Sequence, residues 1–406
     1  MQAILANIIY AFPSRKIKVI GVTGTDGKTT TVQMIAGILE EAGKKVAVAS
    51  TINFKINGEE EINETKFTTL SGFAVQKFIK KAVQSGCKYL VLETSSHSLD
   101  QYRIWGVRYN TAVITNVTRE HLDYHKTIKK YRKAKSKLFK SADVAIVNLD
   151  MEEPEEFLKC SAENKYGYAT MNHESRIMNQ GIKIIKAENI ELETSLSKFE
   201  IQNSKFKIHL LGLFNIENAL AAACVGISEG IRLETIKKAL EKIKGIPGRM
   251  ELVSNKKNLN IIVDFALTPH ALTQLYIFVD GIKKQGAKVI GVFGACGERD
   301  RGKRPITGEI VSAHTDYVIL TDDEPYHEDP KRIIEEISAG INNKLEGENF
   351  WKIPDRREAI KKALLLAKPG DFVVVTGMGA ENTRGVGNQK IPWNDKKVIL
   401  EELSKL

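Results

Sequence analysis

The sequence lacks the features that mark disulfide-rich, zinc-binding and membrane-spanning proteins. It has only four cysteines, which lie far apart and form no CxxC pair: Cys87, Cys160, Cys224 and Cys296. Such spacing indicates neither a disulfide framework nor a cysteine zinc site, and it is typical of proteins kept in a reducing compartment. No apolar run reaches the roughly 18 residues that a transmembrane helix requires.

A signal peptide and a nucleic-acid-binding surface are lacking too. The N-terminal stretch MQAILANIIYAF is apolar but has no basic n-region and no small-residue cleavage site, so we expect residues 1–16 to form only a short helical segment. Lys and Arg number 60 against 50 Asp and Glu, and this net charge of +10 favours anionic partners. The lysines are dispersed without interleaved aromatics, which argues against nucleic acid. We therefore expect a cytoplasmic protein with no membrane or nucleic-acid partner.

The hydrophobic pattern predicts an α/β fold in the first half of the chain. Short β-branched runs predict strands at 17–24, 45–51, 89–94, 111–116 and 144–150. Helical patterns such as 31–43 lie between them, and this alternation is typical of a parallel, doubly wound sheet. Alternating segments over 183–210 predict antiparallel strands appended to that core. Two helices are expected at 215–230 and 233–245.

The turn Gly245-Ile-Pro-Gly248 marks an expected domain boundary. Strand and helix patterns then resume, with strands expected at 260–266, 288–294, 317–323 and 371–377. We therefore predict a first α/β domain with a parallel sheet over 17–246. A C-terminal Rossmann-like α/β domain is predicted over 247–406.

The strongest local motif is GVTGTDGKTT, over residues 21–30. It follows a predicted strand and precedes a predicted helix, which is the context that a phosphate loop requires. Glycines let backbone N–H groups surround phosphate oxygens, Lys28 adds a positive charge, and the Thr29 hydroxyl can bind Mg²⁺. The spacing differs from the commonest pattern, because Val22 stands five positions before Gly27. The alternative is a glycine turn opening a core helix, but the combined context favours nucleotide binding.

Polar side chains follow two more predicted strands at the same edge of the sheet. Glu93 ends one strand, where a carboxylate can hold Mg²⁺ or hydrogen-bond a loop. Four more polar residues follow the strand at 111–116: Asn116, His121, Asp123 and His125. A single histidine there is more often a structural hydrogen-bond partner than a metal ligand. Because this histidine shares a sheet edge with Glu93 and the phosphate loop, a role in a metal or substrate site is favoured here.

These stretches together resemble the Mur ligases, ATP-dependent amide-forming enzymes of peptidoglycan synthesis. The sequence is most similar to the type that adds the third peptide residue to a UDP-N-acetylmuramoyl-dipeptide. The matching stretches run in family order from about residue 17 to 406: GVTGTDGKTTT, FTTLSG, LETSSHSLDQYR, TNVTREHLDYH, YRKAKSKLF, GLFNIENALAA, GIPGRMELV, VDFALTPHAL, GERDRGKRP and GNQKIPWND.

The resemblance implies ATP and two Mg²⁺ ions as cofactors. It assigns the ATP contacts to Gly24, Thr25, Asp26, Gly27, Lys28, Thr29, Thr30, Asn116, Asn215, Asn218, Arg249 and Asp264. The implied metal ligands are Thr29, Glu93, His121 and Lys135, the last carbamylated so that a cation becomes a metal-binding anion. The implied catalytic residues are Lys28, Glu93, His121 and Lys135.

The resemblance also implies the substrate contacts. The muramoyl peptide would contact Thr68, Thr69, Ser95 and Arg103. The incoming amino acid would contact Arg299, Asp323, Glu324, Tyr326, Gly377 and Glu381. The implied partners are small molecules, namely ATP, UDP-muramoyl-dipeptide and an amino acid, and we expect a monomer.

The sequence departs from the family pattern at three places. The phosphate loop starts about twenty residues in, so the family's N-terminal UDP-binding domain is expected to be absent or reduced to a helix. The family's diaminopimelate selector, DNPR, reads here as Asp323-Glu324-Pro325-Tyr326, and a phenol cannot offer a carboxylate the bidentate fork of arginine. Diaminopimelate is therefore disfavoured unless His327 or Arg384 compensates, and Glu324 would instead suit an amine, as on lysine or ornithine. The family's GKGHE-like loop reads here as Gly-Met-Gly-Ala-Glu over 377–381, and the histidine of its YAHTP-like segment is replaced by Leu267. Glu381 is kept, but two polar groups of the family are missing.

Two alternatives follow from these departures. Folylpolyglutamate synthases have the same two-domain core without the first domain, so a ligase acting on a folate or another acceptor is the first. The second is a nucleotide-binding partner that has lost its chemistry. The retention of Lys28, Thr29, Glu93, His121 and Lys135 argues against it.

Overall fold

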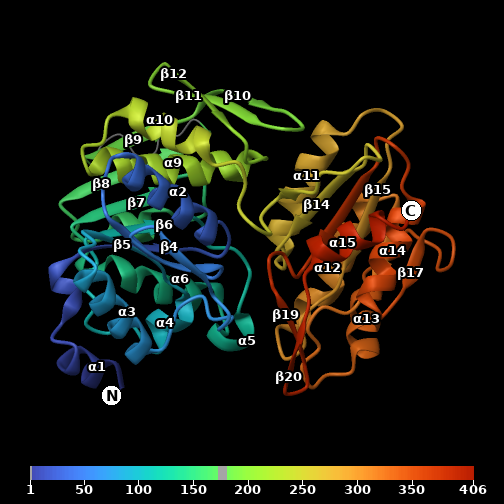
Figure 1. Cartoon of the computed structure of the whole chain (residues 1–406), viewed down its shortest axis with the longest axis horizontal. Helices are drawn as coiled ribbons and strands as arrows, with labels where there is room; N and C mark the ends of the chain where they lie inside the picture. The colour runs from blue at the N-terminus through green and yellow to red at the C-terminus, as the bar shows by residue number, and fades with distance from the viewer. Residues whose placement is uncertain (1, 172–180) are drawn as a thin grey trace. The chain divides into compact units, whose positions relative to one another are not determined.

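In the computed structural model, which describes residues 2–171 and 181–406, the chain divides into two units (Figure 1). The first unit comprises Met1–Thr118 and His125–Lys244, and the second comprises Arg119–Tyr124 and Gly245–Leu406. The short segment Arg119–Tyr124 thus groups with the second unit, which no sequence pattern indicated. None of the helices in the described part of the chain is long and apolar enough to cross a membrane.

A nine-stranded sheet forms the centre of the first unit, in the order β4-β3-β2-β5-β1-β6-β7-β8-β9. Its strands are β1 (Lys18–Thr23), β2 (Val46–Ala49), β3 (Asn53–Ile56), β4 (Glu59–Ile62), β5 (Tyr89–Glu93), β6 (Thr111–Ile114), β7 (Val144–Asn148), β8 (Asn164–Ala169) and β9 (Ile182–Lys186). All neighbours pair in parallel except β2-β3 and β3-β4. The predicted parallel sheet is confirmed, and the antiparallel hairpin β3-β4 extends one edge.

Helices cover both faces of this sheet, because successive strand residues point to opposite sides and both sides are apolar. The helices of this unit are α1 (Gln2–Ile9), α2 (Lys28–Glu41), α3 (Gly72–Gln84), α4 (Ser96–Asp100), α6 (Ile128–Ser136), α7 (Glu155–Leu158), α9 (Leu213–Ser228) and α10 (Leu233–Lys242), with the 3₁₀ turns η1 (Pro13–Lys16) and η2 (Lys137–Ser141). The short helix α5 (Leu122–His125) lies mostly in the segment that groups with the second unit. Helices α2, α9 and α10 pack together on one face. On the other face Val19, Leu90 and Ile114 share a buried core with Ile79 of α3 and Tyr131 of α6.

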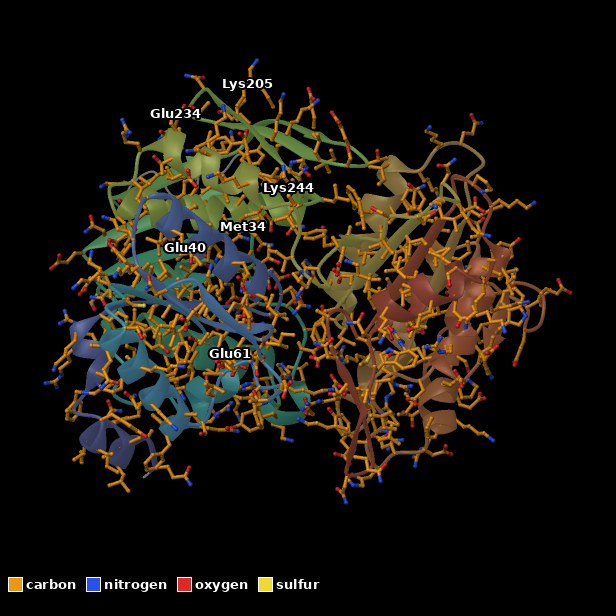
Figure 2. All side chains as sticks on the ribbon, in the orientation of Figure 1. Met34, Glu40, Glu61, Lys205, Glu234 and Lys244 are labelled. Atoms are coloured by element: carbon orange, nitrogen blue, oxygen red, sulfur yellow. The ribbon has the colours of Figure 1, made fainter. Side chains whose placement is uncertain are left out.

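Side chains fill the space between these layers (Figure 2). Met34 of α2 is fully buried, whereas Lys205 and Glu234 are exposed at the rim of the unit.

A separate three-stranded antiparallel sheet follows, formed by β10 (Glu188–Leu192), β11 (Ser197–Ile201) and β12 (Ser204–Ile208). The prediction of antiparallel strands over 183–210 is therefore correct for these three strands. It is wrong for the first part of the range, because β9 pairs in parallel with β8 and completes the large sheet.

The second unit contains a six-stranded sheet in the order β13-β14-β18-β15-β16-β17. Its strands are β13 (Glu251–Leu252), β14 (Asn260–Asp264), β15 (Val289–Phe293), β16 (Tyr317–Leu320), β17 (Phe350–Lys352) and β18 (Phe372–Thr376), and the hairpin β19 (Thr383–Val386) and β20 (Gln389–Pro392) stands apart. Strand β13 pairs antiparallel and the others pair in parallel. The predicted second α/β fold is confirmed.

Two groups of helices flank the second sheet. The helices are α11 (Pro269–Ile282), α12 (Arg304–His314), α13 (Pro330–Ser338), α14 (Arg356–Leu366) and α15 (Asp395–Leu403), with the 3₁₀ turn η3 (Arg301–Lys303). Helix α12 packs between α11 and α13, whereas α14 packs with α15. Ile360 of α14 and Ile399 of α15 share a core with Val263, Val292 and Val375 of the sheet.

Candidate active site

The phosphate loop connects β1 to the N-terminus of α2, and two glycines allow its shape. A Cβ atom on Gly24 would lie 1.7 Å from Thr115 Oγ1, and one on Gly27 would lie 2.3 Å from Asn218 Oδ1. Gly27 also has a φ of 79°, a left-handed backbone that favours glycine. The first turn of α2 therefore presents backbone N–H groups that can donate hydrogen bonds to phosphate oxygens.

Two asparagines from other elements support this loop. Asn116 Oδ1, just after β6, accepts from the backbone N–H groups of Thr25 at 3.1 Å and Asp26 at 2.9 Å. Asn218 of α9 accepts a hydrogen bond from Thr31 Oγ1 at 3.1 Å and donates to Asn215 Oδ1 at 3.1 Å. The three asparagines of the predicted ATP site therefore brace or adjoin the loop.

Two lysines converge on one carbonyl of the loop. Lys28 Nζ donates to the carbonyl oxygens of Gly24 at 3.1 Å and Thr25 at 2.8 Å. Lys135 Nζ, on α6, donates to the same Gly24 oxygen at 2.6 Å, and its side chain is 1% exposed. Burial, and to a smaller degree the Lys28 cation, lower the pKa of Lys135 well below its ordinary value, against a weaker opposing effect of Asp26.

Glu93 lies beside the loop, at the end of β5 and next to β1 in the sheet. It is 1% exposed, and its carboxylate accepts from Thr29 Oγ1 at 3.1 Å, from the Thr51 backbone N–H at 2.8 Å and from Thr51 Oγ1 at 2.9 Å. A buried carboxylate beside a threonine hydroxyl offers the hard oxygen ligands that Mg²⁺ prefers. Thr51 was not predicted, because nothing in the sequence distinguishes it from other loop threonines.

The donor set is small without a further ligand. In the described residues, no three His, Cys, Asp or Glu side chains gather as a metal group. Mg²⁺ is commonly held by one or two carboxylates plus substrate phosphates, so Thr29 and Glu93 fit the ion if a nucleotide completes its shell.

The predicted peptide-contacting residues lie on the other side of Glu93. Thr69 Oγ1 donates to the Glu93 backbone oxygen at 3.0 Å and accepts from the Ser95 backbone N–H at 2.9 Å. Arg103 donates from its guanidinium to the Thr69 backbone oxygen at 2.8 Å. Thr68 precedes this group and is partly buried. The structure thus brings the predicted metal and acceptor residues of this unit into one contiguous cluster.

Three of the residues predicted to contact ATP or metal belong to the second unit and are described with it. His121 lies in the segment Arg119–Tyr124 and has a left-handed φ of 56°. Arg249 stacks over the Phe265 ring, with 4.4 Å between its guanidinium carbon and the ring centroid. Asp264, at the end of β14, accepts from the backbone N–H groups of Met250 and Ala266, each at 2.6 Å.

Asp323 sits in a buried ion network rather than on an open surface. Its side chain is fully buried and pairs with the Arg356 guanidinium at 2.5 Å. Arg356 also pairs with Asp395 at 2.6 Å and donates to the Thr376 backbone oxygen at 2.8 Å. Burial raises the pKa of Asp323 to about 7, although Arg356 opposes this shift. Gly377 approaches so closely that its Cβ would lie 2.3 Å from Asp323 Oδ2.

The Glu324 carboxylate is held by its neighbours. It accepts from the Gly385 backbone N–H at 2.9 Å and from the Tyr326 hydroxyl at 3.2 Å. The Tyr326 ring packs on Gly385, whose Cβ would meet it at 2.6 Å. Burial and the Glu324 charge raise the pKa of Tyr326 far above its ordinary range, so its hydroxyl keeps its proton and acts as a donor.

The two residues considered as replacements for the selector arginine already have partners. Arg384 pairs with Asp322 at 2.6 Å, and His327 lies 2.8 Å from Glu298 Oε1. Arg299 is exposed, and Glu381 is partly buried in a turn in which its N–H donates to the Met378 oxygen at 3.0 Å.

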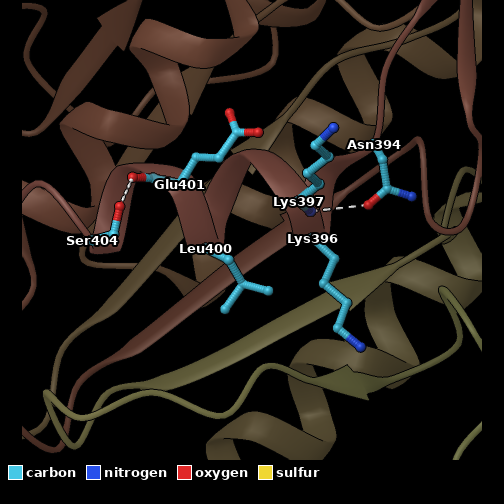
Figure 3. A pocket seen from close by; sticks show the side chains of 6 residues that line it. All are labelled: Asn394, Lys396, Lys397, Leu400, Glu401 and Ser404. Carbon is cyan, nitrogen blue, oxygen red and sulfur yellow. Dashed lines mark hydrogen bonds between the residues drawn. The ribbon is translucent and has the colours of Figure 1, made fainter.

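A shallow groove of about 460 Å³ lies on α15 (Figure 3). It is lined by Asn394, Lys396, Lys397, Leu400, Glu401 and Ser404. Two of these side chains already serve the ends of α15, since Asn394 accepts from the Lys397 N–H at 2.9 Å and the Ser404 hydroxyl donates to the Glu401 oxygen at 2.7 Å. No predicted site residue lines this groove.

Comparison with known families matches both units. The model of the Mur ligase middle domain matches residues 22–226, and the model of the Mur ligase glutamate ligase domain matches residues 248–379.

Similar proteins are longer than this chain. A UDP-N-acetylmuramoyl-L-alanyl-D-glutamate--2,6-diaminopimelate ligase of Clostridium tetani is 38% identical, over 100% of this chain and 81% of that protein. A UDP-N-acetylmuramyl-tripeptide synthetase of a Roseiflexus species is 35% identical, over 99% of this chain and 81% of that protein. A solved structure of a UDP-N-acetylmuramoyl-L-alanyl-D-glutamate--2,6-diaminopimelate ligase superposes with a TM-score of 0.64 at 31% identity, over 96% of this chain and 78% of that one.

Proposed function

Because the chain belongs to the Mur ligase family, whose members are ATP-dependent, ADP-forming amide ligases that use Mg²⁺, we propose that it adds the third residue of the stem peptide to UDP-N-acetylmuramoyl-L-alanyl-D-glutamate. The names of its relatives support this acceptor. The observation that carries the proposal is the continuity of the site: Glu93 contacts Thr29 of the phosphate loop through its carboxylate and Thr69 of the acceptor group through its backbone.

The reaction has two chemical steps. A carboxylate oxygen of the acceptor attacks the γ-phosphorus of ATP, the bond to the β-phosphate oxygen breaks, and ADP leaves. The amine of the amino acid then attacks the acyl-phosphate carbon and loses a proton, and phosphate leaves as the amide forms. The first step brings a carboxylate up to a triphosphate, so the repulsion between these like charges must be offset there.

The residues of the first unit would provide that offset. Lys28 would release the loop carbonyls and contact the terminal phosphates, while the backbone N–H groups of α2 would bind their oxygens. Thr29 and Glu93 would hold Mg²⁺, which stabilises the charge that develops on the transferred phosphoryl group. Thr69, Ser95 and Arg103 would orient the acceptor, whose carboxylate Arg103 attracts.

We infer that Lys135 is carbamylated and completes the metal site. Its nitrogen lone pair forms a bond to the carbon of CO₂, a C–O π pair moves to oxygen, and the nitrogen gives a proton to water. The lowered pKa favours the neutral amine that this reaction needs. If Lys135→Ala ligates as well as the native enzyme without added bicarbonate or chloride, the carbamate has no role.

For the amino acid, we propose a preference for an amine-bearing side chain over diaminopimelate. Glu324 is a partly desolvated carboxylate at the predicted site, and Tyr326 stands where an arginine would be needed for a distal carboxylate. A similar protein is named as a diaminopimelate ligase, so this preference would distinguish the present chain from that relative. Amino-acid-dependent phosphate release from a panel containing lysine, ornithine and diaminopimelate tests it, and a strong preference for diaminopimelate would refute it.

We also propose the domain limits 1–16, 17–246 and 247–406, a monomeric state and action in the cytoplasm. The division of the units between Lys244 and Gly245 supports the second limit. The remaining predicted contacts, including the His121 ligand and the Arg249 and Asp264 contacts to ATP, stay proposals.

The decisive test is the mass of the product. Purified protein is incubated with ATP, Mg²⁺, UDP-muramoyl-dipeptide and single amino acids, and parallel arms contain a folate or a free dipeptide as acceptor. Ligation of the muramoyl acceptor alone, with ADP formed only when acceptor and amino acid are both present, supports the proposal. Ligation only in the folate arm, or no ligation in any arm, contradicts it.

A further inference from the structure

The amine of Lys135 has a second contact that its role as a metal ligand does not explain. One contact is the Gly24 carbonyl, to which Nζ donates at 2.6 Å. The other is the ring of Tyr131, one helical turn earlier on α6, with 4.3 Å between Nζ and the ring centroid. A lysine side chain has many accessible rotamers, so both contacts matter for where the amine lies.

Tyr131 is itself fixed at two further points. Its side chain is 1% exposed, and its hydroxyl lies 3.2 Å from Thr25 Oγ1 in the phosphate loop. Its ring packs on the ring of His125, with 5.1 Å between centroids. A tyrosine that only filled the core would not need contacts to the loop, to a histidine and to the lysine at once.

The His125 side chain connects Tyr131 to the acceptor side. His125 is 5% exposed, and its Nε2 lies 3.0 Å from the hydroxyl of Ser96, which is 2% exposed. Ser96 begins α4 directly after Ser95, which belongs to the group that contacts Glu93 through Thr69. We call Ser96, His125 and Tyr131 the tyrosine bracket.

We propose that the tyrosine bracket positions Lys135 for carbamylation: the Tyr131 ring packs against the amine and limits where it can lie, and His125 and Ser96 hold the ring in place. This inference rests on the carbamate proposed above. Tyr131 and His125 are positioning residues, since neither is assigned a contact to substrate. Removing the ring takes away one of the two contacts described for the amine, so the modified lysine occupies the metal-binding position in fewer molecules.

The test measures the modification itself, in the protein without nucleotide or metal. Native enzyme and variants are equilibrated with ¹³C-bicarbonate, and the carbamate signal is measured by ¹³C NMR, with Lys135→Ala identifying the signal. Tyr131→Leu removes the ring, Tyr131→Phe keeps the ring and loses only the hydroxyl, and His125→Asn removes the support. The matched control is Tyr166→Leu, because Tyr166 is 5% exposed and lies under a different lysine, with Lys183 Nζ 5.4 Å from its ring.

We expect Tyr131→Leu to need about tenfold more bicarbonate for half-maximal carbamate signal, with kcat falling in proportion and recovering at high bicarbonate. KM for ATP should change less than about twofold. Tyr131→Phe should keep the native signal, His125→Asn should fall between, and Tyr166→Leu should match the native enzyme. A folded Tyr131→Leu with native bicarbonate dependence overturns the inference.

Two other outcomes are also decisive. If Tyr131→Leu does not fold, His125→Asn takes its place, and a native bicarbonate dependence in that variant overturns the inference. If the native enzyme ligates but shows no carbamate signal at any bicarbonate concentration, the proposed carbamate itself is wrong, which is distinct from a signal that is present and insensitive to Tyr131.

Discussion

Gly24 has no room for any side chain, so it gives the sharpest test at the scale of single residues. Gly24→Ala places a Cβ 1.7 Å from Thr115 Oγ1 and must displace the loop. A shift costing at least 1.4 kcal/mol weakens binding of a non-hydrolysable ATP analogue at least about tenfold. Gly37→Ala, within α2, is the control, because a Cβ at Gly37 would meet only the Ile243 side chain, at an ordinary contact distance of 3.6 Å. Calorimetry that finds equal affinity in both variants would contradict this view of the loop.

The buried carboxyl of Asp323 predicts a pH dependence of stability. Its pKa rises from 3.8 to about 7 in the folded protein. Between about pH 4 and 7 the folded state therefore retains a proton that the unfolded state has lost, and the contribution of this group to stability falls as pH rises. Asp323→Asn removes that dependence, so its Tm relative to native protein should rise from pH 5 to pH 8. A constant difference in Tm across this range would show that the carboxyl is ionised throughout.

Which residues could be predicted depended on whether the chemistry is local in the sequence. Lys28 and Thr29 could be predicted because they lie in a recognisable phosphate-loop motif, and Glu93 because it ends an apolar strand. Thr51 and Tyr131 were not, since the contacts of Thr51 to Glu93 and of Tyr131 to Thr25 arise only when distant segments meet. Tyr131 lies four residues before Lys135 on α6, and this helical spacing was the signal that could have found it.

At the scale of elements, Arg356 connects the start of α14 to residues at or near the ends of three other elements. It joins Asp323 after β16, the Thr376 oxygen of β18 and Asp395 of α15, all in buried surroundings. Arg356→Met leaves two buried carboxylates without their cation. We expect the second unit to lose about 3–5 kcal/mol, measured by urea unfolding.

The neighbouring arginine supplies the control for that measurement. Arg357 pairs with Glu401 at 2.6 Å and Glu402 at 2.7 Å but is partly exposed. Glu401 is partly exposed and the buried Glu402 keeps Lys405 as a second cation at 2.7 Å, so Arg357→Met should cost less than about 1 kcal/mol. If the two variants lose equal stability, the buried network does not hold α14 in place.

The hydrophobic pattern predicted the parallel strands because buried β-branched runs are visible without knowing their neighbours. It did not reveal the β3-β4 hairpin, although Asn57-Gly58 at its turn is a strong hairpin signal, with φ of 50° and 93°. The exposed strand β4 carries Glu59, Glu60 and Glu61 and so lacks the apolar alternation that marks a strand. Strand β9 was placed in the wrong sheet because pattern alone does not state which edge a strand joins.

At the scale of the whole molecule, the phosphate loop belongs to one unit only. An ATP analogue with Mg²⁺, present at about 100 times its Kd, should stabilise that unit by about 2.7 kcal/mol and raise its Tm by roughly 5–11 °C. Chelating Mg²⁺ with EDTA should shrink the shift, because Thr29 and Glu93 would then lack the ion. A shift that is equally large in EDTA would show that these oxygens bind no metal.

The most direct test of the central claim, transfer of the γ-phosphoryl group to the acceptor carboxylate, follows an oxygen atom. The acceptor carboxylate is labelled with ¹⁸O, ligation is run with Mg²⁺ and ATP, and the released phosphate is analysed by mass. An acyl-phosphate route predicts that one labelled oxygen leaves with each phosphate, since the carboxylate oxygen that attacked the phosphorus stays bound to it. Phosphate without label, formed alongside amide product, would contradict this account.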